Sequence, residues 1–443
     1  MSYRKAFAIA SAAMAWTALA ACADIAELQT TREHAFEVWL IDQSDTRGKT
    51  FGGSLYIFDG ADLRVDDPSS AAPKEVIDLS LDVAALCQNA TGANPVRPHM
   101  LLFNRPHTHA ILSFVASGHV AVLDAAQRKP LACVRTTQSA TGRQAHAAFP
   151  APDGSFIVIA NQNGKRLERI DTDFSSNTFT HNLQATLDLA ACTTPGGFAC
   201  QDATLRPDNA PICAIIESTS RYVFVTLRGG GMFIVDARST PMQIVAEYDR
   251  AAVKGNGCGG TQVGGDMFIN SGGRPGNLPH LDLFGFDVYR FPAAGYPADR
   301  PNQPAPRLVY SAPGEHDSHG MTATPNGRHV WVMDRHANTA EVLSTSRLQR
   351  VNTVRLAGDL SADPAPDLVD ASPAGDQLFV ALRGPTPLSG DPHIATGSTP
   401  GLGVLELDRE GRGGRLAAIL RITNVDATGV ERADAHAVRV RRK

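Results

Sequence analysis

Four histidines and one aspartate recur at one position of a repeated pattern. His99 lies nine residues before Thr108 and 24 before Leu123. His146 keeps the same two intervals to Ser155 and Ile170, and His319 keeps them to Arg328 and Leu343. Asp367 precedes Asp376 by the same nine residues, and His436 opens the last apolar stretch of the chain. Imidazole nitrogen suits copper, zinc, iron or nickel. If the five side chains converge, the pattern predicts a site for a transition metal, copper or zinc, or for a small ligand.

A second interpretation stays open. A histidine at the start of a buried strand can instead hydrogen-bond a neighbouring backbone group or a water molecule. A metal requires nitrogen atoms about 2.0–2.1 Å from one ion, and equivalent positions around a wide channel need not come that close. The sequence therefore offers a metal site and a polar channel lining as alternatives.

The elements that carry these residues form a sevenfold repeat. A short apolar strand ending in an acidic or small polar residue occurs seven times, with ends at Asp59, Asp124, Asp171, Asp236, Asp287, Ser344 and Asp408. Each end follows another β-rich segment, and helical periodicity is almost absent. Four short strands repeated seven times predict an all-β, seven-bladed β-propeller.

The two ends of the chain favour closure of the propeller by strand pairing. The first blade begins with 37–41 and lacks an inner strand, whereas 436–440 supplies a surplus one. We therefore expect the C-terminal strand to complete the N-terminal blade. The predicted organisation is a signal peptide over 1–21, a tether over 22–33 and a single propeller domain over 34–443.

One blade carries a recognisable repeat motif. The stretch from His319 to Val332, continued by Asn338 to Leu343, is built from a small-residue strand, a Pro-Asn-Gly turn, a second strand, and an Asn-Thr pair before a third. It resembles the YVTN-type β-propeller repeat, a family that includes lactonase-like propellers. The resemblance implies the propeller fold and leaves binding and enzymatic roles open.

In such a propeller the inner strands begin around one axis, so the five residues should form a ring, which we call the axial ring: His99, His146, His319, His436 and Asp367. Glu315, Asp317 and Asp434 are candidates to orient its imidazoles. Loops on the same face carry His119, His316, His336 and His393. Arg228 and Arg383 end second strands and could hold an anion there.

The N-terminus resembles a bacterial lipoprotein signal. Arg4 and Lys5 precede an apolar segment, Ala6 to Ala20, which is too short for a permanent membrane span. Leu19-Ala20-Ala21-Cys22 resembles a lipobox, which implies lipidation of Cys22, export, and anchoring to the outer membrane from the periplasm. Cleavage after Ala23 by an ordinary signal peptidase is the alternative.

Six cysteines remain after Cys22: Cys87, Cys133, Cys192, Cys200, Cys213 and Cys258. An even number in an exported protein predicts up to three disulfides. The Pro-Gly-Gly loop between Cys192 and Cys200 favours that pair, and the other pairings stay open.

Composition narrows the function classes. The chain has 41 basic and 45 acidic residues, a net charge of −4, so a nucleic-acid partner is not expected. We expect an exported binding protein whose axial ring holds a metal, a small ligand or a protein partner. The alternatives are a metal-dependent oxidoreductase or a lactonase-like hydrolase on the same face, and a purely structural surface protein.

Overall fold

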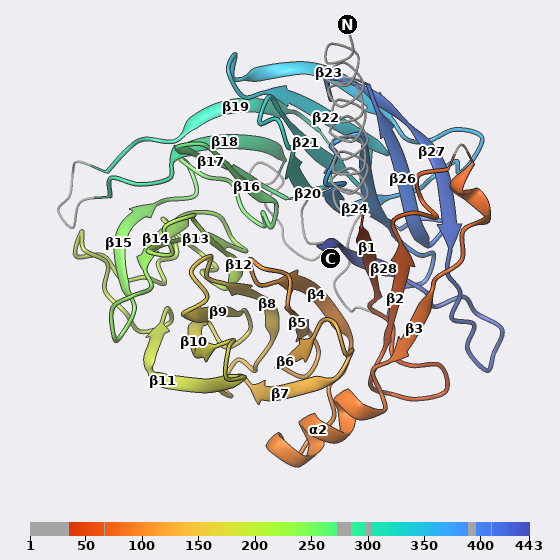
Figure 1. The fold of residues 1–443 in the computed structure, drawn as a ribbon. Helices are drawn as coiled ribbons and strands as arrows, with labels where there is room; N and C mark the ends of the chain where they lie inside the picture. The colour runs from red at the N-terminus through yellow and green to blue at the C-terminus, as the bar shows by residue number, and fades with distance from the viewer. Residues whose placement is uncertain are drawn as a thin grey trace, which may run out of the picture.

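The computed structural model describes residues 35–65, 67–272, 285–296, 303–314, 316–388, 396–408 and 410–443. Seven four-stranded antiparallel sheets surround one axis (Figure 1). This arrangement confirms the predicted seven-bladed propeller. Cys22 and the predicted signal peptide lie outside the described residues.

The blades follow one another along the chain, and within each blade the strands run in order from the axis outward. Blade 1 contains β28 (Ala435–Arg442), β1 (Phe36–Asp42), β2 (Ser54–Asp59) and β3 (Glu75–Asp78). Blade 2 contains β4 (Pro98–Phe103), β5 (His109–Phe114), β6 (His119–Asp124) and β7 (Pro130–Arg135). Blade 3 contains β8 (Ala145–Pro150), β9 (Phe156–Asn161), β10 (Arg166–Asp173) and β11 (Thr178–Asp188). Blade 4 contains β12 (Pro211–Ile216), β13 (Tyr222–Leu227), β14 (Met232–Asp236) and β15 (Gln243–Tyr248).

The remaining three blades have the same plan. Blade 5 contains β16 (Gly260–Val263), β17 (Asp266–Asn270), β18 (Phe286–Pro292) and β19 (Arg307–Ala312). Blade 6 contains β20 (Ser318–Ala323), β21 (His329–Asp334), β22 (Thr339–Ser344) and β23 (Gln349–Arg355). Blade 7 contains β24 (Pro366–Ala371), β25 (Gln377–Leu382), β26 (Gly401–Leu407) and β27 (Gly414–Arg421).

The propeller closes through the C-terminal strand. β28 pairs antiparallel with β1, from Phe36 opposite Arg442 to Asp42 opposite Ala435. This confirms the expected closure and places His436 on an inner strand beside blades 2 and 7. β28 thus covers the inner edge of β1, which would otherwise be unpaired.

Two details differ from the sequence prediction. In blade 5 the third strand begins, rather than ends, near Asp287, and it continues through Val288, Tyr289 and Phe291 to Pro292. The long connection between β3 and β4 also folds into an α-helix, α2 (Asp82–Thr91), and a short 3-10 turn, η1 (Pro68–Ser70), precedes β3. α2 buries Val83, Ala84 and Cys87.

Three disulfides join the six cysteines. Cys87 of α2 is bonded to Cys133 of β7, Cys192 to Cys200 within one loop, and Cys213 of β12 to Cys258 just before β16. The expected Cys192–Cys200 pair is therefore confirmed. The third disulfide is the one that lies near the axis.

No helix within the described ranges is long and apolar enough to cross a membrane.

Candidate metal centre

The axial ring is built from β-bulges. The inner strands of blades 1, 2, 3, 4, 6 and 7 each lose register with their neighbour at the same place, beside His436, His99, His146, Ile212, His319 and Asp367 respectively. A bulge leaves an extra residue outside the regular ladder and redirects its side chain. Five of these six bulges present a residue of the axial ring, and the bulge of blade 4 carries Ile212 and Cys213.

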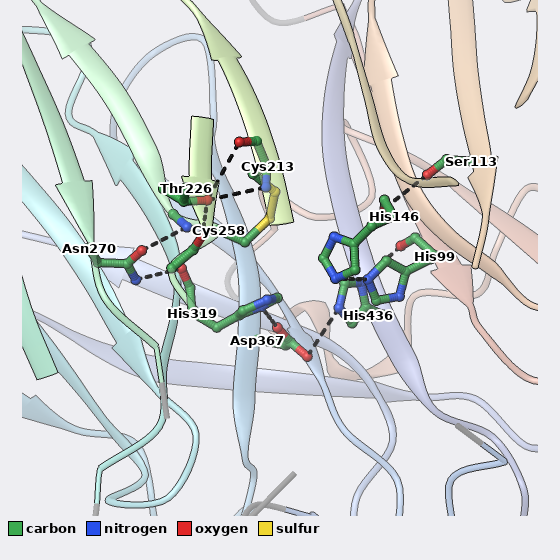
Figure 2. Close-up of a disulfide and its surroundings, with 12 residues drawn as sticks. His99, Ser113, His146, Cys213, Thr226, Cys258, Asn270, His319, Asp367 and His436 are labelled. Atoms are coloured by element: carbon green, nitrogen blue, oxygen red, sulfur yellow. Dashed lines mark hydrogen bonds and ion pairs between the residues drawn. A yellow bond between two sulfur atoms is a disulfide. The ribbon is translucent and has the colours of Figure 1, made fainter. Parts of the chain in front are cut away.

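The five side chains converge at the axis. The imidazole centroids of His99 and His436 lie 3.8 Å apart, those of His99 and His146 4.5 Å apart, and those of His319 and His436 5.2 Å apart. Figure 2 shows His319 and Asp367 facing the group formed by His99, His146 and His436. The channel is therefore narrow enough for all four imidazoles to be neighbours. Each of the five residues is at most 6% exposed.

In three of the imidazoles Nδ1 is hydrogen-bonded to an oxygen atom, which belongs to Gln43 or to another member of the axial ring. His99 Nδ1 lies 2.9 Å from Gln43 Oε1, and His436 Nδ1 lies 2.8 Å from the carbonyl oxygen of His99. His319 Nδ1 is hydrogen-bonded to Asp367 Oδ1. Because carbonyl, amide and carboxylate oxygens accept, each Nδ1 carries the proton, and in the neutral ring Nε2 carries the lone pair.

The orientation of Gln43 follows from its other contact. Its Nε2 donates to Asp434 Oδ2 at 2.6 Å, which leaves Oε1 for His99. A histidine that donates one ring N–H to an oxygen acceptor and offers its other nitrogen is the usual arrangement around bound metals. Three of the four imidazoles meet that condition.

The Nε2 atoms of His99 and His146 lie 3.3 Å apart. In the metal-free protein a proton on His146 Nε2 turns this contact into a hydrogen bond. Two nitrogens bound to one tetrahedral ion at about 2.0–2.1 Å would be separated by about 3.3–3.4 Å. The pair is therefore already spaced as two ligands of one ion.

The opposite side of the axial ring supplies a second ligand group. Ligand atoms of His319, Asp367 and His436 all lie within 4.8 Å of one another. His436 Nε2 makes no hydrogen bond to any described residue and lies 3.9 Å from Asp367 Oδ2. This nitrogen is fully buried, so its lone pair points into the axial ring with no donor from the described residues to satisfy it.

Behind the imidazoles runs a buried chain of alternating charges. Arg335 bridges Asp317 at 2.8 Å and Asp367 at 3.2 Å. Arg383 binds Asp367 at 2.9 Å and holds both oxygens of Asp434, at 2.7 and 2.8 Å. The chain has one more carboxylate than guanidinium groups. With neutral imidazoles, its excess negative charge favours a cation at the axis.

The protonation states agree with this description. Burial lowers the pKa of His99 and of His436 well below 6.5, and burial together with Arg335 lowers that of His319. Burial opposes ionisation of Asp367, yet Arg335, His319, His436 and Arg383 together hold the pKa of Asp367 well below its usual range. Near neutral pH the imidazoles of His99, His319 and His436 are therefore neutral and Asp367 is a carboxylate, the forms that bind metals.

We expect the metal-free protein to lose stability as the pH falls below about 6.5. Unfolded histidines take up protons there, whereas His99, His319 and His436 stay neutral to lower pH in the folded protein. Each proton bound only by the unfolded chain lowers the free energy of unfolding by about 1.4 kcal/mol per pH unit. His119, whose pKa burial lowers to about 4, adds to the loss. Asp42 opposes it, because burial raises its pKa to about 6 and the folded protein takes up that proton first.

Urea unfolding at several pH values between about 7.5 and 5 measures this net effect. The groups with a lowered pKa outnumber those with a raised pKa, so the free energy of unfolding should fall with falling pH; the first set is His99, His107, His119, His319 and His436, and the second is Asp42, Asp45 and His316. A free energy that stays constant or rises over that range would contradict the assigned protonation states.

Glycines allow the inner strands to come this close. A Cβ atom on Gly320 would lie 2.2 Å from the carbonyl oxygen of Asp367, and one on Gly259 would lie 2.3 Å from that of His319. Both positions therefore require glycine unless a strand moves. The Gly-rich stretch from 255 to 260 thus acts in packing beside the axis.

Other sequence candidates are placed elsewhere or have other partners. His316 Nδ1 pairs with Asp334 at 2.5 Å, and His119 bonds to Ser117 and Thr91. Arg228 and Arg383 are ion-paired with carboxylates rather than open to an anion, since Arg228 binds Asp208. Glu315 and His393 lie outside the described residues.

Asp317 and Asp434 lie near the axis as expected, but they bind Arg335, and Arg383 with Gln43, rather than an imidazole directly. Two residues that contact ring members, Arg335 and Gln43, were missed from the sequence. Arg335 directly follows β21, as Arg383 follows β25, so alignment of second-strand ends could have found it. Gln43 had no such signal, because its partners His99 and Asp434 are 56 and 391 residues away in sequence.

Comparison with known proteins supports the fold. No protein-family model matches the chain. No curated protein matches it either. A Lactobacillus plantarum protein superposes with a TM-score of 0.56 at 12% identity, covering 91% of this chain and 99% of that one. The periplasmic gluconolactonase of Pseudomonas aeruginosa gives 0.55 at 14% identity, with the same coverage. A Bacteroides fragilis protein described as a candidate 6-phosphogluconolactonase gives 0.51 at 12% identity, over 92% and 98%.

At these identities the likeness shows the propeller fold alone. The YVTN-type resemblance of the repeats stays a prediction.

Proposed function

We propose that this protein binds one transition-metal ion, copper or zinc, at the axial ring. The observation that carries the proposal is the orientation of the imidazoles: His99, His319 and His436 each have Nδ1 bonded to an oxygen acceptor, which leaves Nε2 as the ligand nitrogen. A purely structural lining needs no such common orientation. Four imidazoles around one centre suit copper and zinc better than the hard ions magnesium or calcium, which prefer oxygen ligands.

The electrostatics support a cation rather than an anion. The residues around the axis are buried, burial keeps the imidazoles of His99, His319 and His436 neutral by lowering their pKa, and the chain from Asp317 to Asp434 contributes one net negative charge. An anion would have to displace carboxylates from Arg335 and Arg383, which are fully buried and already paired. Breaking such buried pairs is costly.

Titration of chelator-treated protein with Cu(II) or Zn(II) tests the proposal. We expect one ion per chain and a higher melting temperature on binding. A free ion concentration 100 times the Kd should add about 2.7 kcal/mol to the free energy of unfolding. Absence of stoichiometric uptake, or uptake without stabilisation, would contradict a built site at the axis.

We further propose that the protein is exported and held at the outer membrane by lipid on Cys22, in the periplasm. The lipobox-like sequence before Cys22 supports this location. The three disulfides fit an oxidising compartment.

Mass spectrometry of the mature N-terminus tests the anchor. We expect a diacylglyceryl group on Cys22. An unmodified N-terminus at Asp24 would instead show ordinary secretion after cleavage at Ala23.

A further inference from the structure

The disulfide between Cys213 and Cys258 borders the axial ring. Cys213 lies in the bulge of β12, and Cys258 precedes β16 by two residues, so the bond joins blades 4 and 5 beside the axis. One ring nitrogen of His146 and the two sulfur atoms all lie within 4.8 Å of one another. Figure 2 shows the disulfide across the axis from His146. Both cysteines are buried.

We propose that reduction of this disulfide creates a second metal subsite, in which Cys213, Cys258 and His146 bind Cu(I). In the disulfide the sulfurs are weak ligands. As thiolates they are soft donors, which favour Cu(I). The inference shares only His146 with the proposed function and otherwise stands apart from it.

The chemistry needs a reductant, and a dithiol donor supplies it. The donor's two thiols become its own disulfide, and two electrons and two protons pass to Cys213 and Cys258, whose S–S bond breaks. On binding Cu(I), the two cysteine thiols release their protons to solvent. Copper keeps its oxidation state throughout.

The backbone around the two cysteines does not depend on the S–S bond alone. Thr226 of β13 accepts a hydrogen bond from Cys213 N at 3.2 Å and donates one to Gly257 O at 2.5 Å. One side chain thus links both cysteine segments. The two sulfurs should stay near each other after reduction, which lowers the cost of gathering them around an ion.

The other two disulfides lack this setting. Cys87–Cys133 fastens α2 to the outer strand of blade 2, and Cys192–Cys200 closes a loop that also carries a Thr193–Ala199 bridge. Over the described residues, the groups of three or more candidate ligands are His146 with Cys213 and Cys258, and His319 with Asp367 and His436. Within the described residues, the axial disulfide is therefore the one whose sulfurs lie in a candidate ligand group with a histidine.

The two subsites together predict a change in capacity. In the oxidised protein the four imidazoles hold one ion. After reduction, His146 joins the thiolates, and His99, His319, His436 and Asp367 remain for the first ion. The capacity of the axis for Cu(I) should therefore rise from one to two ions per chain.

The experiment uses the mature chain, reduced with a water-soluble phosphine. The phosphine is then removed under exclusion of oxygen, and the protein is titrated with Cu(I) in competition with a coloured chelator. We expect one ion per oxidised chain and a thiolate-to-copper absorption band only after reduction. Because the phosphine also opens Cys87–Cys133 and Cys192–Cys200, the extra axial ion is counted as the difference between reduced wild type and reduced Cys213→Ser with Cys258→Ser. Cys213→Ser with Cys258→Ser should abolish the extra ion. The matched variant Cys192→Ser with Cys200→Ser should keep it.

A second measurement needs no cysteine variant. Alkylation of the reduced wild-type protein followed by mass spectrometry should show that Cu(I) protects Cys213 and Cys258, and that His146→Ala weakens this protection at least about 10-fold in Cu(I) concentration. Unprotected cysteines, or an extra ion that persists in Cys213→Ser with Cys258→Ser, would overturn the inference. If the proposed function is wrong, the oxidised protein binds no ion, and this result is independent of what the reduced protein binds.

Discussion

Replacing His146 and His319 together by alanine is expected to remove stoichiometric binding of copper and zinc and leave the propeller folded. The two residues come from blades 3 and 6, on opposite sides of the axis, so the double variant removes one ligand from each half of the axial ring. Loss of a group that only orients a ligand costs about 10–100-fold in metal affinity. Loss of two ligands should cost more than about 100-fold in Kd.

A matched double variant controls for the removal of two buried histidines. His109 and His329 are as buried as the ring histidines, but they bond to Asn177 and to the carbonyl of Glu410, away from the axis. His109→Ala with His329→Ala should bind metal as the wild-type protein does. Undiminished metal content in His146→Ala with His319→Ala would refute the axial ring as the metal site and leave it a structural lining.

Asp367→Ala is expected to cost about 3–5 kcal/mol in the free energy of unfolding, the usual cost of removing one partner of a buried ion pair. Asp367 is fully buried and binds both Arg335 and Arg383, so its loss leaves two guanidinium groups short of negative charge. His319 Nδ1 also loses its acceptor. Asp367→Asn keeps the shape but not the charge and should also be strongly destabilised.

Urea unfolding, with equal slopes for variant and wild type, measures this loss. Glu406→Ala is the comparison, because Glu406 pairs with Arg415 on the surface and such pairs contribute at most about 1 kcal/mol. If Asp367→Ala were no more destabilising than Glu406→Ala, the chain of alternating charges would not stabilise the folded propeller, and the role assigned to that chain would be contradicted.

The sequence predicted the propeller because its repeat is local. Each blade places apolar strands and turn residues at short spacing, so seven strand ends could be counted without knowledge of their contacts. The ring histidines were found for the same reason, since His99, His146 and His319 keep one distance to the strands that follow. Closure by β28 followed from a strand missing at one end and surplus at the other.

The remaining features depend on contacts between distant segments. Gln43 reaches the axis from a loop with no register in common with the repeat, and its partners His99 and Asp434 are distant in sequence. The bulges that turn the ring side chains inward arise from pairing between strands, which no single strand reveals. In blade 5, the long segment between β17 and β18 obscured the repeat, and the Phe-Asp pair at 286–287 resembled a strand end although the strand begins there.

The most direct measurement is an anomalous-scattering map of crystals grown from zinc-loaded, oxidised protein, recorded above and below the zinc absorption edge. We predict one peak per chain at the axis, about 2.0–2.1 Å from Nε2 of at least three of His99, His146, His319 and His436. Zinc bound only at surface histidines, with no peak among these four imidazoles, would contradict the assignment of the axial ring as a metal site.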